Sequence, residues 1–554
     1  MMQECLVTQK SNCKNCYKCI RHCPVKSIRF TDGQAHIIRD ECILCGECYI
    51  VCPQDAKQIR KDKDVANELV LKHEVYVSLA PSYAAWFSES TMSDMEFALK
   101  KLGFAGVAGT AVGAEIVKKR YEEIINNNEN NVIISSCCHT VNELIERHFE
   151  NAVKYLAKVV TPMGAHTTLL KEEHPGAKVV FVGPCISKKA EAEKFGSADA
   201  VLTFEELEEW LLEEGISVPK SEKTDDTHRT DAFAVSGGIL KSMDLKEDFN
   251  YIVIDGVENC INVLRDIDNK KLKNCFIEMS ACAGSCVGGP VMKKKSRNLI
   301  MDRILVEEGY GEKNYNLELN SSVDRNFNFA GIFKTMPGGA AIEEILKKMG
   351  KTTPAQELNC GSCGYNTCRE KAAAVLMGKA DLSMCMPYLK EKAESFSDNI
   401  IRNTPNGIIV LDDALNVQQI NNAARKILNL KITDDIIGSP VVRILDPIDY
   451  VLTLSEEKNI YDNRKYLAEY QRYVEETVIY DREYHIVMII MKDITDEENM
   501  KNSRDSQCRA AVEITDKVVE KQMRVVQEIA SLLGETTAET KIALTKLKES
   551  LMDE

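Results

Sequence analysis

Cysteine is the residue whose number and spacing point most directly to chemistry. The 554-residue chain has 21 cysteines, and most of them fall within residues 13–52, 137–286 and 360–385. The N-terminus, MMQECLVTQKSNC, lacks the apolar segment of a secretory signal, so we expect a cytoplasmic protein with reduced thiols. Metal or redox chemistry is therefore a better interpretation than disulfides. The cysteines outside clear motifs are expected to be ordinary thiols: Cys5, Cys260, Cys275 and Cys508.

The first group contains two copies of one four-cysteine pattern. In each copy three cysteines are two residues apart, and a fourth follows after three more residues and precedes a proline. This is the spacing of bacterial ferredoxins, in which the fourth thiolate ligates the other cluster. We expect two 4Fe–4S clusters, one held by Cys13, Cys16, Cys19 and Cys52 and the other by Cys42, Cys45, Cys48 and Cys23. The alternative, a pair of zinc knuckles, fits poorly because zinc takes ligands grouped in pairs.

The second group consists of three motifs, SSCC at 135–138, GPCISKKAE at 183–191 and EMSACAGSCVGG at 278–289. The segments VYVSLAP, NVIISSC, AKVVFVGPC and YIVIDGV are typical of buried strands, and FEELEEWLLEEG and AAIEEILKKMG of helices. This pattern indicates an α/β domain with a mostly parallel sheet. Cysteines follow two of these strands directly, where α/β folds place their sites. Four of the cysteines can close one cubane, and a single ordinary 4Fe–4S site is the alternative.

In this order, behind a two-cluster ferredoxin, the motifs resemble the signatures of FeFe-hydrogenases over roughly residues 75–350. The resemblance implies an H-cluster, in which a 4Fe–4S cubane joins a diiron unit with CO, CN and dithiolate ligands, and the reaction H2 ⇌ 2H+ + 2e−. By position, Lys188 would hydrogen-bond a cyanide, Cys137 would relay protons, and Cys286 would bridge to the diiron unit. The implied cubane ligands are Cys138, Cys185, Cys282 and Cys286, and the further cofactor-binding residues are Gly183, Pro184, Ser187 and Ser280.

Departures from the family pattern predict slow turnover. Gly183 and Ser280 replace two methionines of high-turnover members, and Tyr121 and Ile124 replace two proton-relay glutamates. The Pro-x-Trp sequence that normally follows the paired cysteines is replaced by one beginning at His139. Changes around a metal retune it more than they abolish it. The pattern therefore resembles the sensory branch of the family.

A third cysteine group, with two-residue and four-residue gaps and a more distant fourth member, resembles the small 4Fe–4S domain of several redox proteins. The expected ligands are Cys360, Cys363, Cys368 and Cys385. Zinc is the alternative occupant. With the ferredoxin pair, this group brings the expected number of 4Fe–4S clusters besides the H-cluster to three.

The C-terminal part resembles a signalling module. Residues 393–497 resemble a PAS domain, with a hairpin expected around Asp481-Arg482. Its ligand is unknown, since His485, the one histidine of this segment, is more typical of a packed residue than of a haem ligand. In the tail, Val512, Val519, Met523 and further apolar residues keep heptad spacing, up to a break expected at Gly534. A coiled-coil homodimer is expected, and a helix packed on its own PAS domain is the alternative.

We therefore predict a multi-domain chain with an α+β two-cluster ferredoxin (1–65), an α/β H-cluster domain (70–345), a small helical 4Fe–4S domain (346–392), an α+β PAS domain (393–497) and a helical tail (498–554). The net charge of −15 argues against nucleic acid and membrane surfaces. Expected partners are H2, protons, an electron-carrier protein, and a separate kinase or phosphatase as output. Three functions remain open: a hydrogen sensor, a bidirectional ferredoxin-dependent hydrogenase, and a PAS-linked iron–sulfur redox sensor without diiron.

Overall fold

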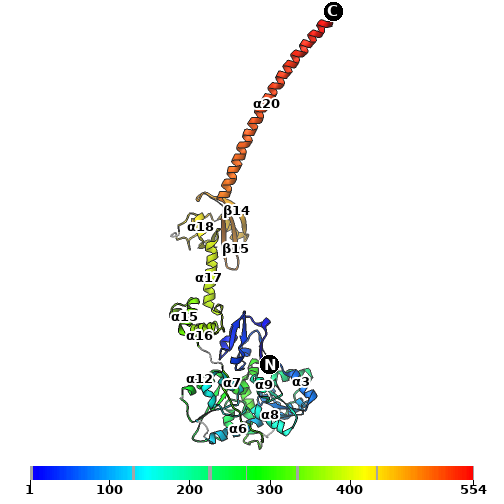
Figure 1. Cartoon of the computed structure of the whole chain (residues 1–554), viewed down its shortest axis with the longest axis vertical. Coiled ribbons are helices and arrows are strands. Elements are labelled where there is room, and N and C mark those ends of the chain that lie inside the picture. Colours follow the sequence, from blue (N-terminus) through cyan, green and yellow to red (C-terminus); the bar gives the residue numbers. More distant parts are fainter. Residues whose placement is uncertain are drawn as a thin grey trace. The chain divides into compact units, whose positions relative to one another are not determined.

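The computed structural model describes residues 4–552 except 128–130, 222–226, 270, 318, 332–335 and 432–434. The chain divides into two compact units, Met1–Leu389 and Lys390–Glu554, whose elements are labelled in Figure 1.

The N-terminal segment consists of two antiparallel strand pairs and short helices. β1 (Leu6–Thr8) pairs with β4 (Lys57–Ile59), and β2 (Ile28–Thr31) pairs with β3 (Gln34–Ile37). The helices are η1 (Lys10–Asn12), α1 (Lys18–His22), η2 (Arg39–Glu41), α2 (Glu47–Ile50) and α3 (Lys63–Lys72). Tyr17 and Gly46, the residues before α1 and α2, have φ of 56° and 79°, so the chain turns sharply between close-set cysteines.

The α/β domain contains two parallel sheets. The first has the order β6-β5-β8-β9, with strands Gly106–Gly109, Val75–Leu79, Lys178–Gly183 and Ala200–Thr203. The second has the order β10-β11-β7, with strands Asn250–Asp255, Cys275–Ser280 and Val132–Ile134. The α-helices that follow the first strand are α4 (Tyr83–Trp86), α5 (Met92–Lys101), α6 (Ala111–Asn126), α7 (His139–His148), α8 (Pro162–Glu173), α9 (Ser187–Phe195), α10 (Phe204–Glu213), α11 (Gly238–Ser242), α12 (Val257–Asp268), α13 (Pro290–Lys294) and α14 (Leu299–Glu307).

The predicted strands form, with one correction. The sequence predicts a buried β10, but none of its residues is buried, because it lies at the edge of the second sheet beside β11. β11, the central strand of that sheet, is buried along its whole length and is not among the predicted strands.

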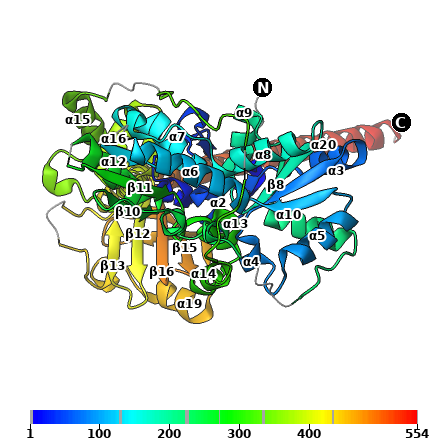
Figure 2. The same cartoon turned by 90° about the horizontal axis from the view of Figure 1, so that it is seen from below.

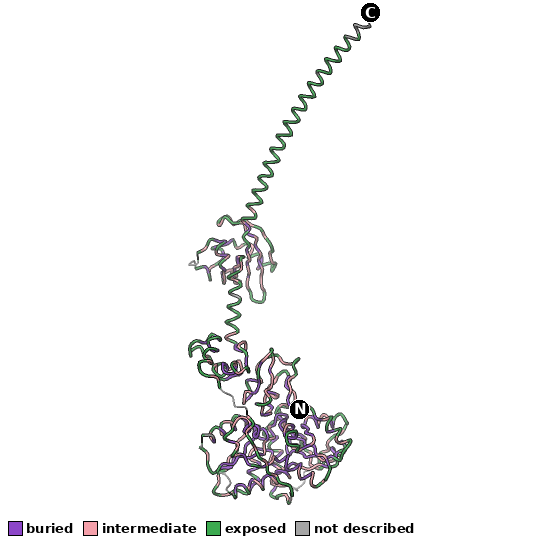
Figure 3. The backbone as a smooth tube through the Cα atoms, in the orientation of Figure 1, coloured by how far each residue is buried: buried purple, intermediate pink, exposed green. Residues whose placement is uncertain are grey.

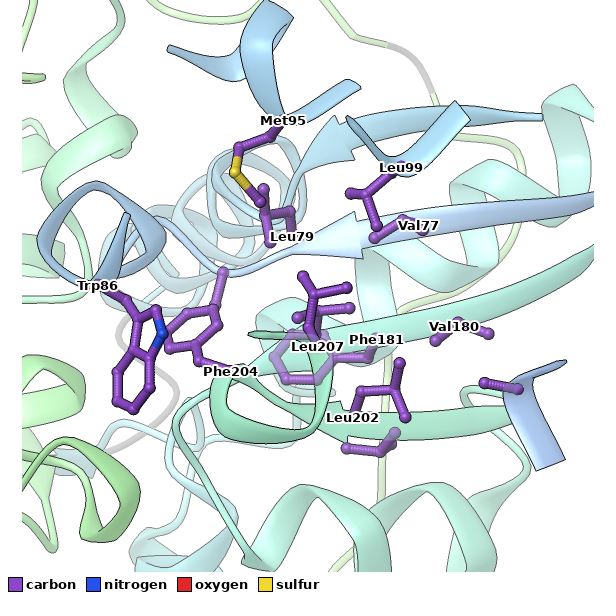
Figure 4. Close-up of a cluster of buried hydrophobic side chains, with 14 of the residues drawn as sticks. Val77, Leu79, Trp86, Met95, Leu99, Val180, Phe181, Leu202, Phe204 and Leu207 are labelled. Atoms are coloured by element: carbon purple, nitrogen blue, oxygen red, sulfur yellow. The ribbon is translucent and has the colours of Figure 1, made fainter. Parts of the chain in front are cut away.

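The core of the first sheet joins its strands to the surrounding helices. Val77, Leu79, Val180, Phe181 and Leu202 come from the strands, and Trp86, Met95, Leu99, Phe204 and Leu207 from the helices (Figure 4). Full burial of each such side chain is worth about 1.5–3 kcal/mol, so this cluster holds the strand ends in fixed positions.

The segment that follows is small and helical. α15 (Gly339–Lys348) packs on α16 (Cys368–Leu376) through Leu346 and Ala372, and Cys385 belongs to the same apolar cluster. The short helix η7 (Leu382–Met384) lies between α16 and Cys385, and α17 (Met386–Asn403) begins directly after that cysteine.

The second unit contains a five-stranded antiparallel sheet in the order β13-β12-β16-β15-β14. The strands are β12 (Gly407–Asp412), β13 (Val417–Ile420), β14 (Ile460–Leu467), β15 (Arg472–Asp481) and β16 (Ile486–Asp493), and the helices are α18 (Asn422–Ile427) and α19 (Ile448–Glu456). Figure 2 shows β13, β12, β16 and β15 side by side in this order. The hairpin predicted around Asp481 is formed, with Asp481 opposite Ile486.

The tail is one helix, α20 (Thr495–Met552), and is exposed at every described residue from 499 onward (Figure 3). The break predicted at Gly534 is absent, because one glycine costs a helix only about 1 kcal/mol and its neighbours continue the helical bonding. The predicted multi-domain fold class is confirmed. Among the described residues, no helix combines the length and the apolar character needed to cross a membrane.

Candidate metal centre

The three central cysteine motifs meet at the carboxyl ends of parallel strands from both sheets. Cys137 and Cys138 follow β7, and Cys185 follows β8 two residues after Gly183. Cys282 and Cys286 follow β11, which pairs directly with β7. The two parallel sheets thus deliver cysteines from three distant segments to one place.

These cysteines line a cavity of about 80 Å³. Its wall also includes Lys188, Pro184 and Ser280 and is otherwise mostly apolar, with Met163, Phe181, Phe233 and Ile239 among its members. Of the eight residues that the hydrogenase resemblance assigns to cubane or cofactor binding, Gly183 and Ser187 are not among the lining residues. Both lie beside them in the chain and are buried.

The donor set fits an iron–sulfur group. Burial raises the pKa of Cys185 to about 11 and that of Cys286 to about 12, and neighbouring thiols add to the effect of burial in raising the pKa of Cys282. Because thiolates are the ligands of iron, binding of a cluster would release the protons of these buried thiols. No three His, Cys, Asp or Glu side chains in the described part of the chain gather closely enough for a single metal ion.

Lys188 is held in place by a buried carboxylate. Its Nζ lies 2.6 Å from Oε2 of Glu191, one turn further along α9. Glu191 also accepts a hydrogen bond from Thr161 and lies 3.8 Å from Arg325. Since an ammonium has three N–H donors, Lys188 keeps donors for a ligand in the cavity. Sequence reasoning assigned no part to Glu191.

Cys137 lines the same cavity as a buried acid, Glu278. Its Sγ lies 3.6 Å from Oγ of Ser135, and Glu278 of β11 is a further lining residue. Burial raises the pKa of Glu278 to about 7, although its carboxylate accepts hydrogen bonds from the backbone N–H groups of Gly237 and Leu240. Burial, together with Glu278, raises the pKa of Cys137. Sequence reasoning gave Glu278 no role, although an acid in the apolar strand CFIEMS is a signal.

Tyr121 of α6 occupies one of the two positions at which the family pattern has a proton-relay glutamate. It is fully buried, and its hydroxyl contacts Ser136, accepting from that residue's backbone N–H at 2.8 Å. Burial raises the pKa of Tyr121 well above its ordinary value. The neighbouring Glu122 instead accepts from the backbone N–H of Asp244.

Two other departures from the family pattern also have a structural setting. A Cβ at Gly183 would lie 2.8 Å from the ring of Phe181, so that ring occupies space a side chain at 183 would need. His139, which follows Cys138, is buried and lines the cavity, and its Nε2 makes no hydrogen bond to any described residue. Burial lowers the pKa of His139 to about 4.

The N-terminal cysteines gather in the two predicted sets. The pKa of Cys19 is raised first by burial and then by Cys13, Cys16 and Cys52. The pKa of Cys48 is raised first by burial and then by Cys45, Cys42 and Cys23. We name these the distal set (Cys13, Cys16, Cys19, Cys52) and the proximal set (Cys23, Cys42, Cys45, Cys48). Backbone N–H groups of Ser27 and Ala56 donate to the sulfurs of Cys23 and Cys52 at 3.3 Å.

The proximal set lies next to the central cavity. A Cβ at Gly46 would collide with Pro290 of α13 at 2.5 Å, so the Cys45–Cys48 loop packs closely on the α/β domain. Cys45 is also near enough to raise the pKa of Cys282, after burial and closer thiols. This arrangement is an ordered series from the distal set through the proximal set to the cavity.

A second cavity is lined by Cys360, Cys363, Cys368 and Cys385, with Tyr365 and Lys371 beside them. All four cysteines come from the small helical segment. We name them the third set. Burial lowers the pKa of Lys371 to about 8, even though the thiols favour its charged form.

Comparison with known families assigns most of these regions. Residues 73–290 match the iron only hydrogenase large subunit, C-terminal domain, and residues 5–53 match a 4Fe-4S dicluster domain. Residues 356–387 match a family described as a putative Fe-S cluster, and residues 395–498 match the PAS fold.

Individual relatives are distant or partial. The chain is 42% identical over 48 residues to one subunit of an ion-translocating oxidoreductase complex of Methanosarcina acetivorans, which is 9% of this chain and 18% of that protein. An FeFe-hydrogenase variant of Chlamydomonas reinhardtii is 16% identical, with a TM-score of 0.37, over 49% of this chain and all of that one. A PAS domain of an HTR-like protein of Haloarcula marismortui is 19% identical, with a TM-score of 0.16, over 19% of this chain and 95% of that one.

The chain thus contains one domain that matches the hydrogenase family and two segments that match iron–sulfur families. It carries an iron-only hydrogenase large-subunit domain behind a dicluster ferredoxin, followed by a further Fe–S domain and a PAS domain.

Proposed function

We propose that this protein is a hydrogen-responsive FeFe-hydrogenase of slow turnover that signals through its PAS domain to a separate protein. The observation that carries the proposal is the buried cavity, where four thiols from three segments lie together with Cys137 and Lys188. An ordinary 4Fe–4S site needs the four thiols alone, and the extra thiol and cation provide for a larger group.

The bound H-cluster would supply the reaction H2 ⇌ 2H+ + 2e−. Its ligands would be Cys138, Cys185, Cys282 and Cys286, in a cavity whose wall is mostly apolar. Lys188, anchored by Glu191, would direct its remaining N–H donors into the cavity. Cys137 and Glu278 would hold and pass protons, since Glu278, with a pKa of about 7, changes protonation near neutral pH.

Slow turnover follows from the groups around Cys137. Tyr121 places a neutral hydroxyl with a raised pKa beside Ser136, where the family pattern has a carboxylate. Proton transfer is most efficient through groups whose pKa lies near the working pH. Tyr121 is therefore a poor proton relay, and this favours a sensor over a bidirectional hydrogenase, the second candidate.

The C-terminal unit supplies the proposed output. Apolar residues Val519, Met523 and Val526 are exposed on α20 at heptad spacing, which favours a parallel coiled-coil homodimer. A separate kinase or phosphatase would read this dimer, and an electron carrier would dock on the ferredoxin.

The test is an assay of H2-driven dye reduction with the full chain carrying all its clusters and a synthetic diiron cofactor. The proposal predicts slow but H2-dependent reduction that disappears in Lys188→Met and persists in the exposed control Lys194→Met. Fast turnover would favour the bidirectional hydrogenase, and no H2-dependent reduction would favour a PAS-linked redox sensor.

A further inference from the structure

The third set packs against the ferredoxin beside the proximal set. The backbone N–H of Phe30 in β2 donates to the carbonyl of Lys379 at 2.8 Å, and the ammonium of Lys379 pairs with the carboxylate of Glu41. The guanidinium of Arg21 donates to the carbonyl of Ser362 at 3.1 Å. These contacts join residues more than 300 positions apart into one surface, which we name the seam.

Lys26 is the central polar residue of the seam. Its Nζ donates to the carbonyls of Ile20, Arg21 and Gly364, at 3.2, 3.0 and 2.9 Å. Gly364 belongs to the cysteine loop of the third set, and Lys26 follows Cys23 of the proximal set by three residues. One partly buried ammonium thus ties the two cysteine loops together.

The loops approach as closely as their backbones allow. Gly364 has a φ of +91°, and a Cβ there would lie 3.0 Å from Ile20 and 3.1 Å from the backbone nitrogen of Arg21. Ile20, Cys23 and Cys48 share one apolar cluster with Tyr365, with Cys363 packed against it. These side chains are in direct apolar contact, so the two cysteine loops pack against each other.

Tyr365 lies between the two cysteine sets. It is buried, and its hydroxyl makes no hydrogen bond within the described residues. Cys363 and Cys23 both add to the effect of burial in raising its pKa, so both sulfurs are near the hydroxyl. An unpaired buried donor beside thiolate sulfurs suits an O–H···S contact to a bound cluster.

We propose that the proximal cluster is a branch point, exchanging electrons across the seam with the cluster of the third set as well as with the distal cluster and the central cavity. In the exchange, one electron leaves the reduced proximal cluster, which is oxidised, and enters the oxidised third cluster, which is reduced; no proton is transferred. That the electrons come from H2 rests on the proposed function. Electron exchange across the seam does not depend on it.

This route has a consequence for signalling. The last cysteine of the third set, Cys385, directly precedes α17, which leads in the chain to the PAS domain at β12. The third cluster is thereby the redox centre nearest in sequence to the signalling unit, and its charge changes at the first turn of that helix.

The experiment uses the full chain with its 4Fe–4S clusters but without the diiron cofactor, reduced stepwise and followed by electron paramagnetic resonance. Adjacent clusters predict spectra broadened by spin coupling. The part of the broadening that comes from the proximal and third clusters should be lost in Cys368→Ala, while the coupling between the distal and proximal clusters remains. Broadening that is the same in Cys368→Ala as in the natural chain would overturn the branch point. Because no diiron unit is present, this result is independent of hydrogen chemistry.

A charge variant gives a second readout. Lys26→Met should lower the midpoint potentials of both the proximal and the third cluster, since a cation between them stabilises the more negative reduced state of each. The control Lys14→Met, at an exposed lysine beside Cys13, should leave both of these potentials unchanged. A shift confined to one cluster, or none, would contradict the shared position of Lys26.

Discussion

The ammonium of Lys188 lies 2.6 Å from the carboxylate of Glu191, which is completely buried. The pair links the cavity to Thr161 and Arg325. The buried carboxylate of Glu191 therefore fixes the direction in which the Lys188 side chain points.

Glu191→Gln should therefore destabilise the protein and loosen Lys188. Removing one partner of a buried pair costs about 3–5 kcal/mol, because the remaining charge stays unpaired. Thermal unfolding under anaerobic conditions measures the loss. The control Glu208→Gln removes an exposed pair with Lys295 and should cost no more than about 1 kcal/mol. Equal losses in the two variants would show that Glu191 does not anchor Lys188.

The raised pKa of Glu278 predicts a pH-dependent stability. The folded pKa of about 7 lies above the ordinary value of 4.5, so the folded state binds more protons between these values. Its contribution is fully present below pH 4.5 and is lost as the pH rises towards 7, by roughly 3 kcal/mol. Unfolding midpoints from about pH 5 to about pH 7.5 should fall more steeply in the natural chain than in Glu278→Gln. Parallel curves would place the Glu278 pKa near its ordinary value.

Cys137→Ala should remove most H2 turnover, about 100-fold or more, while cluster assembly stays intact. The reason is that this thiol, which follows β7, lines the cavity without being a proposed cubane ligand. Cys275→Ala is the matched control, since Cys275 is a buried thiol in the same sheet, on β11, away from the cavity. Unchanged H2 oxidation in Cys137→Ala would mean that protons leave by another route.

The exposed heptad positions of α20 predict self-association. Val519→Glu should convert a dimer to a monomer, as measured by light scattering, because a charge at a heptad core position opposes coiled-coil packing. Val518→Glu changes a neighbouring valine of the same exposure, 53%, outside those positions and should leave the dimer intact. A natural chain that is monomeric would contradict the coiled-coil interpretation.

The sequence predicted what depends on local spacing. The pairing of Cys52 with the distal set and of Cys23 with the proximal set follows from the ferredoxin pattern alone. The hairpin at Asp481 follows from alternation and turn residues. That the three central motifs meet at one site could be predicted only from the resemblance to FeFe-hydrogenases, because spacing within a motif does not show which distant strands are neighbours.

Long-range packing explains what the sequence did not reveal. β10 has the apolar composition of a buried strand, and only its place at a sheet edge leaves it partly exposed. Glu278 becomes significant through Cys137, which is far away in the chain, and the burial of Glu191 beside Lys188 involves the distant Thr161 and Arg325. The seam depends on contacts of Lys26 with Gly364, and neither residue has a local signal for them.

Infrared spectroscopy of the anaerobic protein loaded with the diiron cofactor tests the central claim most directly. The account predicts sharp CO and CN bands that shift reversibly between H2 and argon, with the CN bands moved in Lys188→Met. An absence of such bands, in protein whose 4Fe–4S clusters are fully loaded, would contradict a hydrogen-activating site and leave a PAS-linked iron–sulfur redox protein.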